Sequence, residues 1–376
     1  MALCAVLAVT AACTFGPPPP DEGGKPPNLP APSVSADPDS GDQEVAVTVL
    51  ARKLEVPWGI AFLPDASALV TERDTGRILS VGPGADPATG GLTVREVRRL
   101  SEVAHGGDGG LLGVAVSPKY KIDKSVYVYY STDKDNRVAR LRLDGRPQPI
   151  LTGIPHGTQN NGGGLAFGPD GYLYVGTGDV TAAGTQAANP RSLGGKILRI
   201  TTTGKPAPGN PGRSSPIFAS GFRNVQGLAW DPIRRLYASE ANQKTYGELN
   251  LIRPGRNYGF PRAEGASADA KLTDPVVSWP NADSSCSGVA VQERTIATAC
   301  LLGQRVWFVT TTGNGTLIGR PQALLTGDYG RLRGMAAAPD GSLWVGTSNQ
   351  EDGGDPSPDD DRLIRIVLSS GGAGRS

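Results

Sequence analysis

Residues 164–179 read GLAFGPDGYLYVGTGD and contain the motif around which the rest of this chain is organised. Two runs of small and apolar residues flank Pro169, Asp170 and Gly171, which are residue types that favour tight turns. The run after the turn, YLYV, is rich in aromatic and β-branched side chains and has the length of a short strand. The segment is therefore predicted to form a β-hairpin followed by a polar loop.

The hairpin motif occurs six times. Its copies begin at Trp58, Leu112, Gly164, Gly227, Gly288 and Gly334. A third strand follows in each copy, as GRILSV, ARLRL, KILRI, ELNLI, RVWFV and RLIRI. The copies start roughly 45–65 residues apart, which is the size of a four-stranded propeller blade with variable loops. We therefore predict an all-β fold, a six-bladed β-propeller of four-stranded antiparallel blades, over residues 45–370.

Composition and charge exclude several classes of protein. The 376 residues include 52 Gly and 32 Pro, which disfavour a bundle of long helices. The 37 Lys and Arg residues nearly balance the 36 Asp and Glu residues, so there is no basic field to hold nucleic acid. No apolar run reaches the roughly 18 residues that a membrane-spanning helix needs. We expect a turn-rich β protein with no nucleic-acid partner.

The N-terminal region predicts export. Residues 1–13, MALCAVLAVTAAC, end like a bacterial lipoprotein signal, with Cys13 as the lipid-modified residue. No Lys or Arg precedes the apolar run, which indicates a start codon placed too far downstream; the alternative is a disordered N-terminus without a targeting role. Residues 14–44, rich in Pro and Gly, are predicted to be a disordered tether, and residues 371–376 a disordered tail. We expect a cell-surface lipoprotein, attached to the membrane only through its lipid, or an extracellular protein.

Two cysteines lie in the predicted propeller. Cys286 and Cys300 flank a segment that reads as two short strands around a turn. A cross-strand disulfide fits an oxidising compartment, and the alternative is two buried free thiols.

Propeller topology brings scattered segments to one face. The segment before the first strand of each blade and the loop after its second strand lie on the same face, where propeller ligands usually bind. On this face we place His105–Asp108, His156, Gln159–Asn161, Arg223–Gln226, Glu240–Gln243, Arg331–Arg333 and Asn349–Asp352. Arg223, Arg331 and Arg333 would repel one another there unless an anion lay between them. The alternative is that these arginines are solvated or paired within their loops.

Six segments together resemble one known family. They are GGDGGLLGVAVSP, NGGGLAFGPDGYLYVGTGD, GGKILRI, SGFRNVQGLAWDP, ELNLIRPGRNYGFP and YGRLRGMAAAPDG, in the family's order and over essentially the whole body of the chain. The family is that of the soluble quinoprotein glucose dehydrogenases and aldose sugar dehydrogenases, also called the glucose/sorbosone dehydrogenases. The resemblance implies a six-bladed propeller that holds pyrroloquinoline quinone (PQQ) and Ca²⁺ at one mouth.

The resemblance also implies a mechanism and a set of site residues. In the family a histidine takes the proton of the sugar's anomeric hydroxyl, hydride moves to a carbonyl of PQQ, and Ca²⁺ polarises that carbonyl. The residues that match the family's cofactor contacts, or lie beside them on the same face, are Asp108, Gln159, Arg223, Asn224, Gln226, Arg331 and Arg333. Arginine suits the three carboxylates of PQQ because its planar fork binds carboxylates in two places.

The chain departs from the family at the catalytic base. The family's His-Asn-Gly-Gly-Arg-Leu reads Asn160-Asn161-Gly162-Gly163-Gly164-Leu165 here, so an amide, which cannot act as a base, replaces the histidine. His156, four residues earlier, is a candidate substitute. In the fifth blade, Leu302 stands where the family has a basic residue.

The predicted calcium site is also altered. The family's Glu-His-Gly-Pro loop reads Glu240-Ala241-Asn242-Gln243, and the backbone carbonyls of Asn242 and Gln243 are candidate ligands. Glu248 and the carbonyl of Tyr258 match a second calcium position of the family.

Two functions remain open from sequence. The first is PQQ-dependent oxidation of an aldose or a related polyhydroxy compound, with calcium assistance and an unidentified external electron acceptor. The second is a catalytically degenerate propeller that binds a glycan or a protein at the cell surface, as the related domain of Hedgehog-interacting protein exemplifies.

Overall fold

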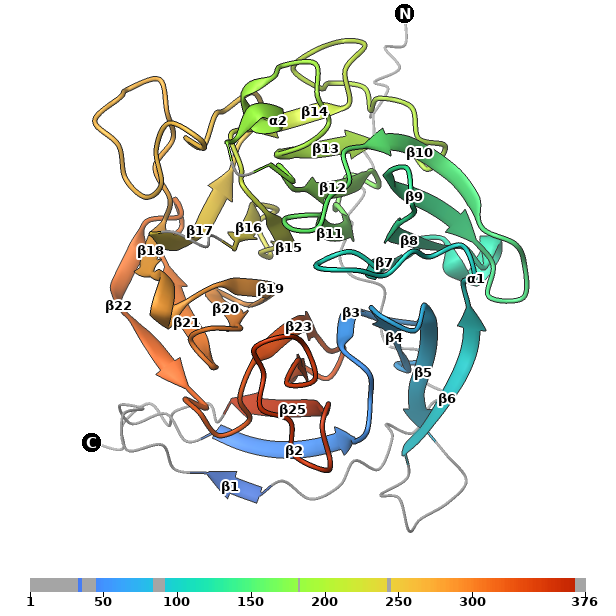
Figure 1. Ribbon diagram of the computed structural model, residues 1–376. Helices are drawn as coiled ribbons and strands as arrows, with labels where there is room; N and C mark the ends of the chain where they lie inside the picture. Colours follow the sequence, from blue (N-terminus) through green and yellow to red (C-terminus); the bar gives the residue numbers. More distant parts are fainter. Residues whose placement is uncertain (1–32, 36–44, 84–91, 182, 242–244, 369–376) are drawn as a thin grey trace, which may run out of the picture.

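Six β-sheets are arranged like the blades of a propeller around a central axis (Figure 1). This computed structural model describes residues 33–35, 45–83, 92–181, 183–241 and 245–368. The predicted all-β fold with six blades is confirmed, and each blade contains four antiparallel strands. The predicted signal segment with Cys13 and the predicted tail beyond residue 370 lie outside the described residues, as does the predicted tether apart from residues 33–35.

The first three blades occur in chain order. Blade 1 contains β3 (Pro57–Phe62), β4 (Ala68–Glu72), β5 (Arg77–Pro83) and β6 (Leu92–Arg99). Blade 2 contains β7 (Leu111–Val116), β8 (Val126–Ser131), β9 (Asn136–Leu141) and β10 (Gln148–Ile154), with α1 (Tyr120–Asp123) between its first two strands. Blade 3 contains β11 (Gly162–Phe167), β12 (Leu173–Thr177), β13 (Lys196–Ile200) and β14 (Ile217–Ser220), with α2 (Thr185–Ala188) in its long loop.

The remaining blades complete the ring. Blade 4 contains β15 (Val225–Trp230), β16 (Leu236–Glu240), β17 (Tyr246–Ile252) and β18 (Val277–Pro280), followed by a 3₁₀ turn at Asn281–Asp283. Blade 5 contains β19 (Cys286–Gln292), β20 (Thr295–Cys300), β21 (Arg305–Thr311) and β22 (Leu317–Leu324). Blade 6 contains β23 (Leu332–Ala337), β24 (Leu343–Thr347), β25 (Leu363–Leu368) and β2 (Val45–Ala51).

The ring is closed by a strand from the start of the chain. β2 pairs antiparallel with β25, from Val45 opposite Leu368 to Ala51 opposite Leu363, and so forms the fourth strand of blade 6 (Figure 1). β1 (Ser33–Ser35) adds a fifth strand by pairing with β2. The sixth copy of the sequence motif supplies only three strands, because the fourth is encoded some 300 residues earlier. This pairing joins the two ends of the propeller.

The hairpin predicted at residues 164–179 has the expected turn. β11 and β12 are joined by a turn in which the backbone N–H of Gly168 donates to the Tyr172 carbonyl and that of Gly171 donates to the Gly168 carbonyl, each at 2.9 Å. Gly171 has φ of 79°, a left-handed conformation that favours glycine. The side chain of Asp170 accepts a hydrogen bond from the N–H of Tyr172 at 3.2 Å.

The innermost strands of neighbouring blades approach closely at a ring of glycines. A Cβ atom added at Gly288 would lie 2.3 Å from the backbone nitrogen of Met335, and one added at Gly334 would lie 2.2 Å from the Trp58 carbonyl oxygen. Close approaches to the next blade also occur at Gly59, Gly113 and Gly227, where an added Cβ would lie 2.2–2.9 Å from the backbone of that blade, and the approach at Gly164 is looser at 3.3 Å. The small residue that recurs in each first strand therefore sets how tightly the blades meet at the axis.

Large apolar side chains fill the space between blades. One core cluster combines Trp58 of blade 1, Tyr127 and Tyr129 of blade 2, and Leu173 and Leu198 of blade 3. Burial of such side chains stabilises the fold by about 1.5–3 kcal/mol each. Among the residues that the structure describes, no helix is both long and apolar enough to span a membrane.

Candidate functional site

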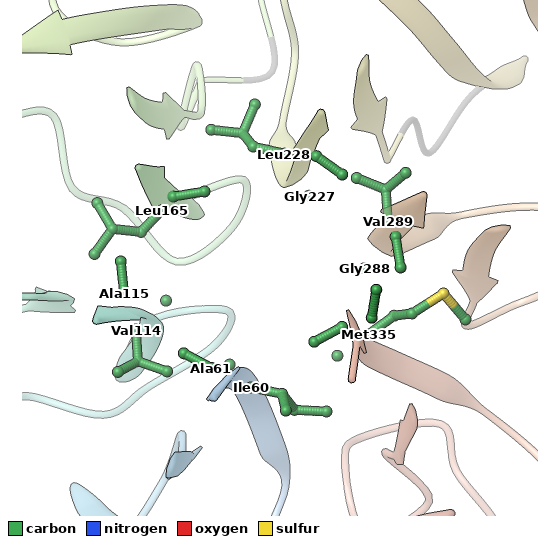
Figure 2. Close-up of a pocket in the computed structure, with 18 of the residues that line it drawn as sticks. Ile60, Ala61, Val114, Ala115, Leu165, Gly227, Leu228, Gly288, Val289 and Met335 are labelled. Atoms are coloured by element: carbon green, nitrogen blue, oxygen red, sulfur yellow. The ribbon is translucent and has the colours of Figure 1, made fainter. Parts of the chain in front are cut away.

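A channel runs along the propeller axis. It has a volume of about 440 Å³, and its wall is formed by the first strands of all six blades. Figure 2 shows apolar side chains from each blade around it, among them Ile60, Val114, Leu165, Leu228 and Met335. This lining offers few polar side chains, so the chemistry of the protein must lie at an end of the channel.

A smaller cavity of about 120 Å³, here called the mouth cavity, opens on the face that the sequence predicts to bind ligands. It is lined by Asp108, Asn224, Gln226, Ala241, Ser285, Leu301, Leu302, Arg331, Arg333 and Glu351. Gln226 also lines the central channel and therefore lies at the junction of the two spaces. The structure thus brings together five of the predicted cofactor contacts, which are Asp108, Asn224, Gln226, Arg331 and Arg333.

An anion does lie between the arginines of the mouth cavity, but it is the protein's own Glu351. This carboxylate lies 2.6 Å from Arg73, forms an ion pair and a hydrogen bond with Arg333, and lies 3.6 Å from Arg331. It also accepts a hydrogen bond from Ser348 at 2.9 Å. Burial alone would raise the pKa of Glu351, but Arg333 and Arg73 outweigh it and lower the pKa to about 2.

Several charged groups of both signs meet around Glu351. Three guanidinium groups face this carboxylate, and Asp74, 2.6 Å from Arg73, offsets only one of them in part. Burial lowers the pKa of Arg331 in spite of Glu351, and Arg333 and Arg73 lower it further. Asp108 is a further carboxylate of the cavity wall, so the two arginines of the wall, Arg331 and Arg333, are matched by two carboxylates.

Arg223 has different surroundings from the other two predicted arginines. Its side chain is buried, 3.6 Å from Glu264, and its guanidinium lies 5.6 Å from the ring centre of Phe260. Its backbone N–H donates to Glu240 at 2.5 Å. Arg223 is not among the residues that line the mouth cavity, and its predicted role in binding a cofactor stays a prediction.

Asn160 occupies the predicted catalytic position. Asn160 is buried and has φ of 56°, a conformation that asparagine tolerates well. Its side-chain amide has no hydrogen-bond partner among the described residues. The backbone N–H of Asn160 donates to Oδ2 of Asp108 at 2.8 Å, which ties the base position to the mouth cavity.

The two histidines lie on loops that precede the first strands of blades 2 and 3. His156 is half-buried on the loop before β11, as Gln159 is, and His105 is exposed on the loop before β7. Neither histidine nor Gln159 is among the residues that line the mouth cavity. Asn161, next to the base position, is buried and fully engaged, because its side chain bonds with Asn136 and with both backbone groups of Gly157.

Two buried carboxylates face each other in blade 4. Glu240 and Glu248 are directly opposite on β16 and β17, and both are buried. Burial, and then neighbouring carboxylates, raise the pKa of each. Oε2 of Glu240 has no hydrogen-bond partner among the described residues, whereas Glu248 accepts bonds from the Gly265 N–H at 2.6 Å and from Asn250 at 3.2 Å.

Of the other predicted calcium ligands, Tyr258 alone belongs to the described residues. Asn242 and Gln243 lie outside the described residues. Tyr258 is buried and stacks on Phe222 at 4.9 Å, and its hydroxyl bonds to the backbone of Leu251 and Arg253. Within the described part of the chain, no group of three or more His, Cys, Asp or Glu side chains is arranged to hold a metal ion. The calcium assignment stays a prediction.

The predicted disulfide is confirmed. Cys286 and Cys300 are bonded and occupy opposite positions on β19 and β20. Each is adjacent to a residue of the cavity wall, Ser285 and Leu301 respectively. The bond therefore fixes the blade 5 side of the mouth.

Sequence reasoning missed the central role of Glu351 and Arg73. Both follow the second strand of their blades, so the rule that placed the other residues on this face also covers them. The sequence places Glu351 on the face of the mouth but indicates no role for it, and Arg73 is not among the predicted site residues. The signal that could have found them is their position directly after VTE and GTSNQ in the repeat.

Together the fold and the mouth define a class of protein, a six-bladed propeller in which separate blades bring arginine, amide and carboxylate side chains to one end of the axial channel. Residues 54–355 match the family model described as glucose/sorbosone dehydrogenase, and the chain belongs to this family.

Named relatives agree with the family. The chain is 29% identical over 283 residues to quinoprotein glucose dehydrogenase B of Acinetobacter calcoaceticus, covering 65% of this chain and 57% of that one. It is 27% identical over 349 residues to an aldose sugar dehydrogenase of Escherichia coli, covering 80% and 89%. This chain therefore spans just over half the length of the Acinetobacter enzyme.

One solved structure has a higher sequence identity to this chain than these two relatives. The PQQ-bound form of an aldose sugar dehydrogenase from Streptomyces coelicolor superposes with a TM-score of 0.81 at 42% identity, covering 88% of this chain and 99% of that one. The likeness extends over nearly the entire solved protein.

Proposed function

We propose that this protein is an oxidoreductase, a PQQ-dependent sugar dehydrogenase whose active site is the mouth cavity. The observation that carries the proposal is the convergence of Asn224, Gln226, Arg331 and Arg333 on one cavity. These are the residues that the family's motifs place against the cofactor, and they come from blades 4 and 6. The 42% identical Streptomyces relative with PQQ bound supports the same reading.

The residues present fit PQQ by their chemistry. The cofactor carries three carboxylates, and Arg331 and Arg333 of the cavity wall offer guanidinium donors that can bind them. Two buried polar atoms of this wall, Oε1 of Gln226 and Nε of Arg331, have no hydrogen-bond partner among the described residues. Leaving such groups unpaired costs about 1–3 kcal/mol each, and a polar ligand would satisfy them.

The size of the cavity limits how a cofactor can lie. Pockets that enclose drug-sized ligands have volumes of about 300–1,000 Å³, whereas the mouth cavity measures about 120 Å³. A tricyclic quinone would therefore place only one edge in the cavity and cover the mouth with the rest. The half-exposed apolar side chain of Leu302 at the rim would contact it and help exclude water.

The side chains of the mouth cavity would have different roles in binding the cofactor. PQQ, when bound, supplies a quinone carbonyl that accepts hydride. Arg331 and Arg333 would hold its carboxylates by charge-assisted hydrogen bonds. Asn224 is held by the N–H of Gly162, which donates to its Oδ1 at 2.9 Å, so its amide nitrogen would be presented in a fixed direction. Gln226 would orient the ligand at the junction with the channel.

We propose that the protein also binds calcium, beside Glu240 and Glu248. The buried pair Glu240 and Glu248 is unfavourable as two neighbouring anions, and a cation would relieve the repulsion. The Asn242 and Gln243 loop and the Tyr258 carbonyl are candidates for the remaining ligands. Ca²⁺ at 100 times its dissociation constant should stabilise the fold by about 2.7 kcal/mol. In a thermal-shift measurement, Glu240→Gln should abolish this stabilisation. An unchanged melting temperature on adding Ca²⁺ excludes calcium.

The proposed substrate is an aldose or a related polyhydroxy compound, oxidised at its anomeric carbon, with an external electron acceptor of unknown identity. We also propose an exported protein, anchored at the cell surface by a lipid on Cys13 or released. The alternative of a degenerate binding propeller is not favoured, because the relatives and solved structures with a named activity in this family are sugar dehydrogenases.

One titration tests the proposal. PQQ is added to the purified, calcium-loaded protein while quinone absorbance is followed, and aldoses are then added with an artificial electron acceptor. Saturable binding with dye reduction is expected. Arg333→Gln should weaken PQQ binding at least tenfold, whereas Arg320→Gln, at an exposed position on β22, should not. Binding without dye reduction indicates a degenerate member, and no binding overturns the proposal.

A further inference from the structure

The chain needs a proton acceptor that its family motif does not supply. Asn160 occupies the position of the family's histidine, and an amide cannot take a proton near neutral pH. The structure adds that Asn160 is buried and is not among the residues of the cavity wall. If the protein oxidises a sugar, as proposed above, another side chain must accept the hydroxyl proton.

The mouth cavity contains two carboxylates, and only one of them is suited to this role. Glu351 contacts three guanidinium groups, which hold it in its charged form and make it a weak base. Neither His105 nor His156 belongs to the cavity wall. The remaining titratable group of the wall that could accept a proton is Asp108.

Asp108 is fixed by two hydrogen bonds on one side and open on the other. Its backbone N–H donates to the Thr158 carbonyl at 3.0 Å, and its Oδ2 accepts from the Asn160 N–H at 2.8 Å. No hydrogen-bond donor reaches its Oδ1 within the described part of the chain, and the side chain is only half-buried. One carboxylate oxygen therefore positions the group, and the other is available to a ligand.

The loop that carries Asp108 has little freedom to move away. Gly107, with φ of 53°, packs so closely on Thr158 that an added Cβ would lie 2.0 Å from the Thr158 carbonyl oxygen. Gly110 is similarly close to the backbone of Arg73, where an added Cβ would lie 2.3 Å from the carbonyl oxygen. The carboxylate is thus held between blades 1 and 3, beside the base position of the family motif.

We propose that Asp108 is the general base of this protein and replaces the missing histidine. Oδ1 accepts the proton of the anomeric hydroxyl as its O–H bond breaks. The C1 hydrogen leaves with its electron pair as hydride to PQQ, the oxidant of the proposed function, and the sugar becomes the lactone. Asp108 releases the proton to water before the next cycle. Asn160 then serves as a positioning residue, whose backbone N–H orients the carboxylate.

Asp108→Asn tests this inference because the amide can still accept the Asn160 N–H. PQQ binding, followed by absorbance, should not weaken, since the charge lost is negative and the guanidinium groups that would bind the cofactor's carboxylates are unchanged. Aldose-dependent dye reduction should fall about 10²–10⁴-fold, the usual contribution of a general base. Asp133→Asn, at an exposed position on the loop after β8, is the matched control and should leave both readouts unchanged.

Further variants separate the outcomes. Asp108→Glu keeps a carboxylate and should retain at least tenfold more turnover than Asp108→Asn, which also covers the case in which the asparagine variant folds poorly. His156→Ala should leave turnover unchanged. Full turnover in Asp108→Asn, or loss of turnover in His156→Ala, overturns the assignment while leaving the proposed function in place. PQQ binding without dye reduction by the unaltered protein overturns both.

Discussion

Arg73, which directly follows the second strand of blade 1, lies 2.6 Å from Glu351, which follows the second strand of blade 6. The two residues are 278 positions apart in sequence, and closure of the ring makes them neighbours. Because Glu351 also contacts Arg331 and Arg333, a single carboxylate joins the first and last blades at the mouth. The arginines are held in place before any ligand arrives, which lowers the ordering cost of binding an anion.

Replacement of Glu351 should change the acid stability of the protein. Since the folded protein lowers the pKa of this group from 4.5 to about 2, its ionised form stabilises the fold above pH 4.5, and this stabilisation is lost as the pH falls toward 2. Glu351→Gln should therefore be less stable than the unaltered protein by about 3 kcal/mol near pH 7, with the difference shrinking below pH 4.

Urea unfolding at several pH values measures this difference. Glu102→Gln, at an exposed position before β7, is the control and should track the unaltered protein at every pH. A stability deficit that stays constant from pH 7 to pH 3 would show that the ion pairs of Glu351 do not carry the effect.

Much of the mouth could be predicted from the repeat alone. The position of a residue relative to the first or second strand of a blade fixes its face, and the structure brings Asp108, Asn224, Gln226, Arg331 and Arg333 together at the mouth cavity. The rule gives the face but not the direction of each side chain. Direction depends on contacts with other blades, and these come from residues distant in sequence.

Arg223 and β2 illustrate what the repeat could not supply. The side chain of Arg223 lies 3.6 Å from Glu264, which belongs to the long connection between β17 and β18. The blade repeat does not predict the course of that connection. β2 completes blade 6 from the opposite end of the chain. Its sequence, VAVTVLA, reads as a strand, but its partner is determined by the need to close the ring rather than by any local pattern.

Restoring a histidine at residue 160 should increase turnover. Histidine tolerates positive φ better than most residues, so the backbone at 56° should accept it. An imidazole beside Asp108 would be a stronger base at neutral pH, and we expect Asn160→His to raise aldose-dependent dye reduction about tenfold or more. The acid limb of kcat/KM should move toward about pH 6.5, the usual range of histidine.

Thr152→His provides the comparison for this variant. Thr152 is exposed on β10 and is not a predicted site residue, so a histidine there should leave both the rate and the pH profile unaltered. An unchanged rate in Asn160→His would count against the alignment that places residue 160 at the family's base position.

The disulfide should contribute measurably to stability. Cys286 and Cys300 are 14 residues apart, and a loop of about this length gives roughly 3 kcal/mol through restriction of the unfolded chain. The Cys286→Ala, Cys300→Ala double variant should lose about that amount in urea unfolding. Added reductant should destabilise the unaltered protein to the same extent and leave the double variant unaffected. Equal sensitivity of the two proteins to reductant would contradict a structural role for the bond.

The glycine ring at the axis yields a prediction on how the blades meet. In Gly288→Ala the new methyl group would lie 2.3 Å from the backbone nitrogen of Met335, and backbone cannot move aside as a flexible side chain can. Blades 5 and 6 would have to separate, so we expect a loss of about 3 kcal/mol or more. Gly313→Ala is the matched control, because nothing lies within 4 Å of an added Cβ there. Since Arg331 directly precedes the strand that would be displaced and Arg333 lies within it, PQQ affinity should fall in Gly288→Ala and remain intact in Gly313→Ala. If both variants melt at the same temperature, the close approach of first strands does not determine the geometry of the mouth.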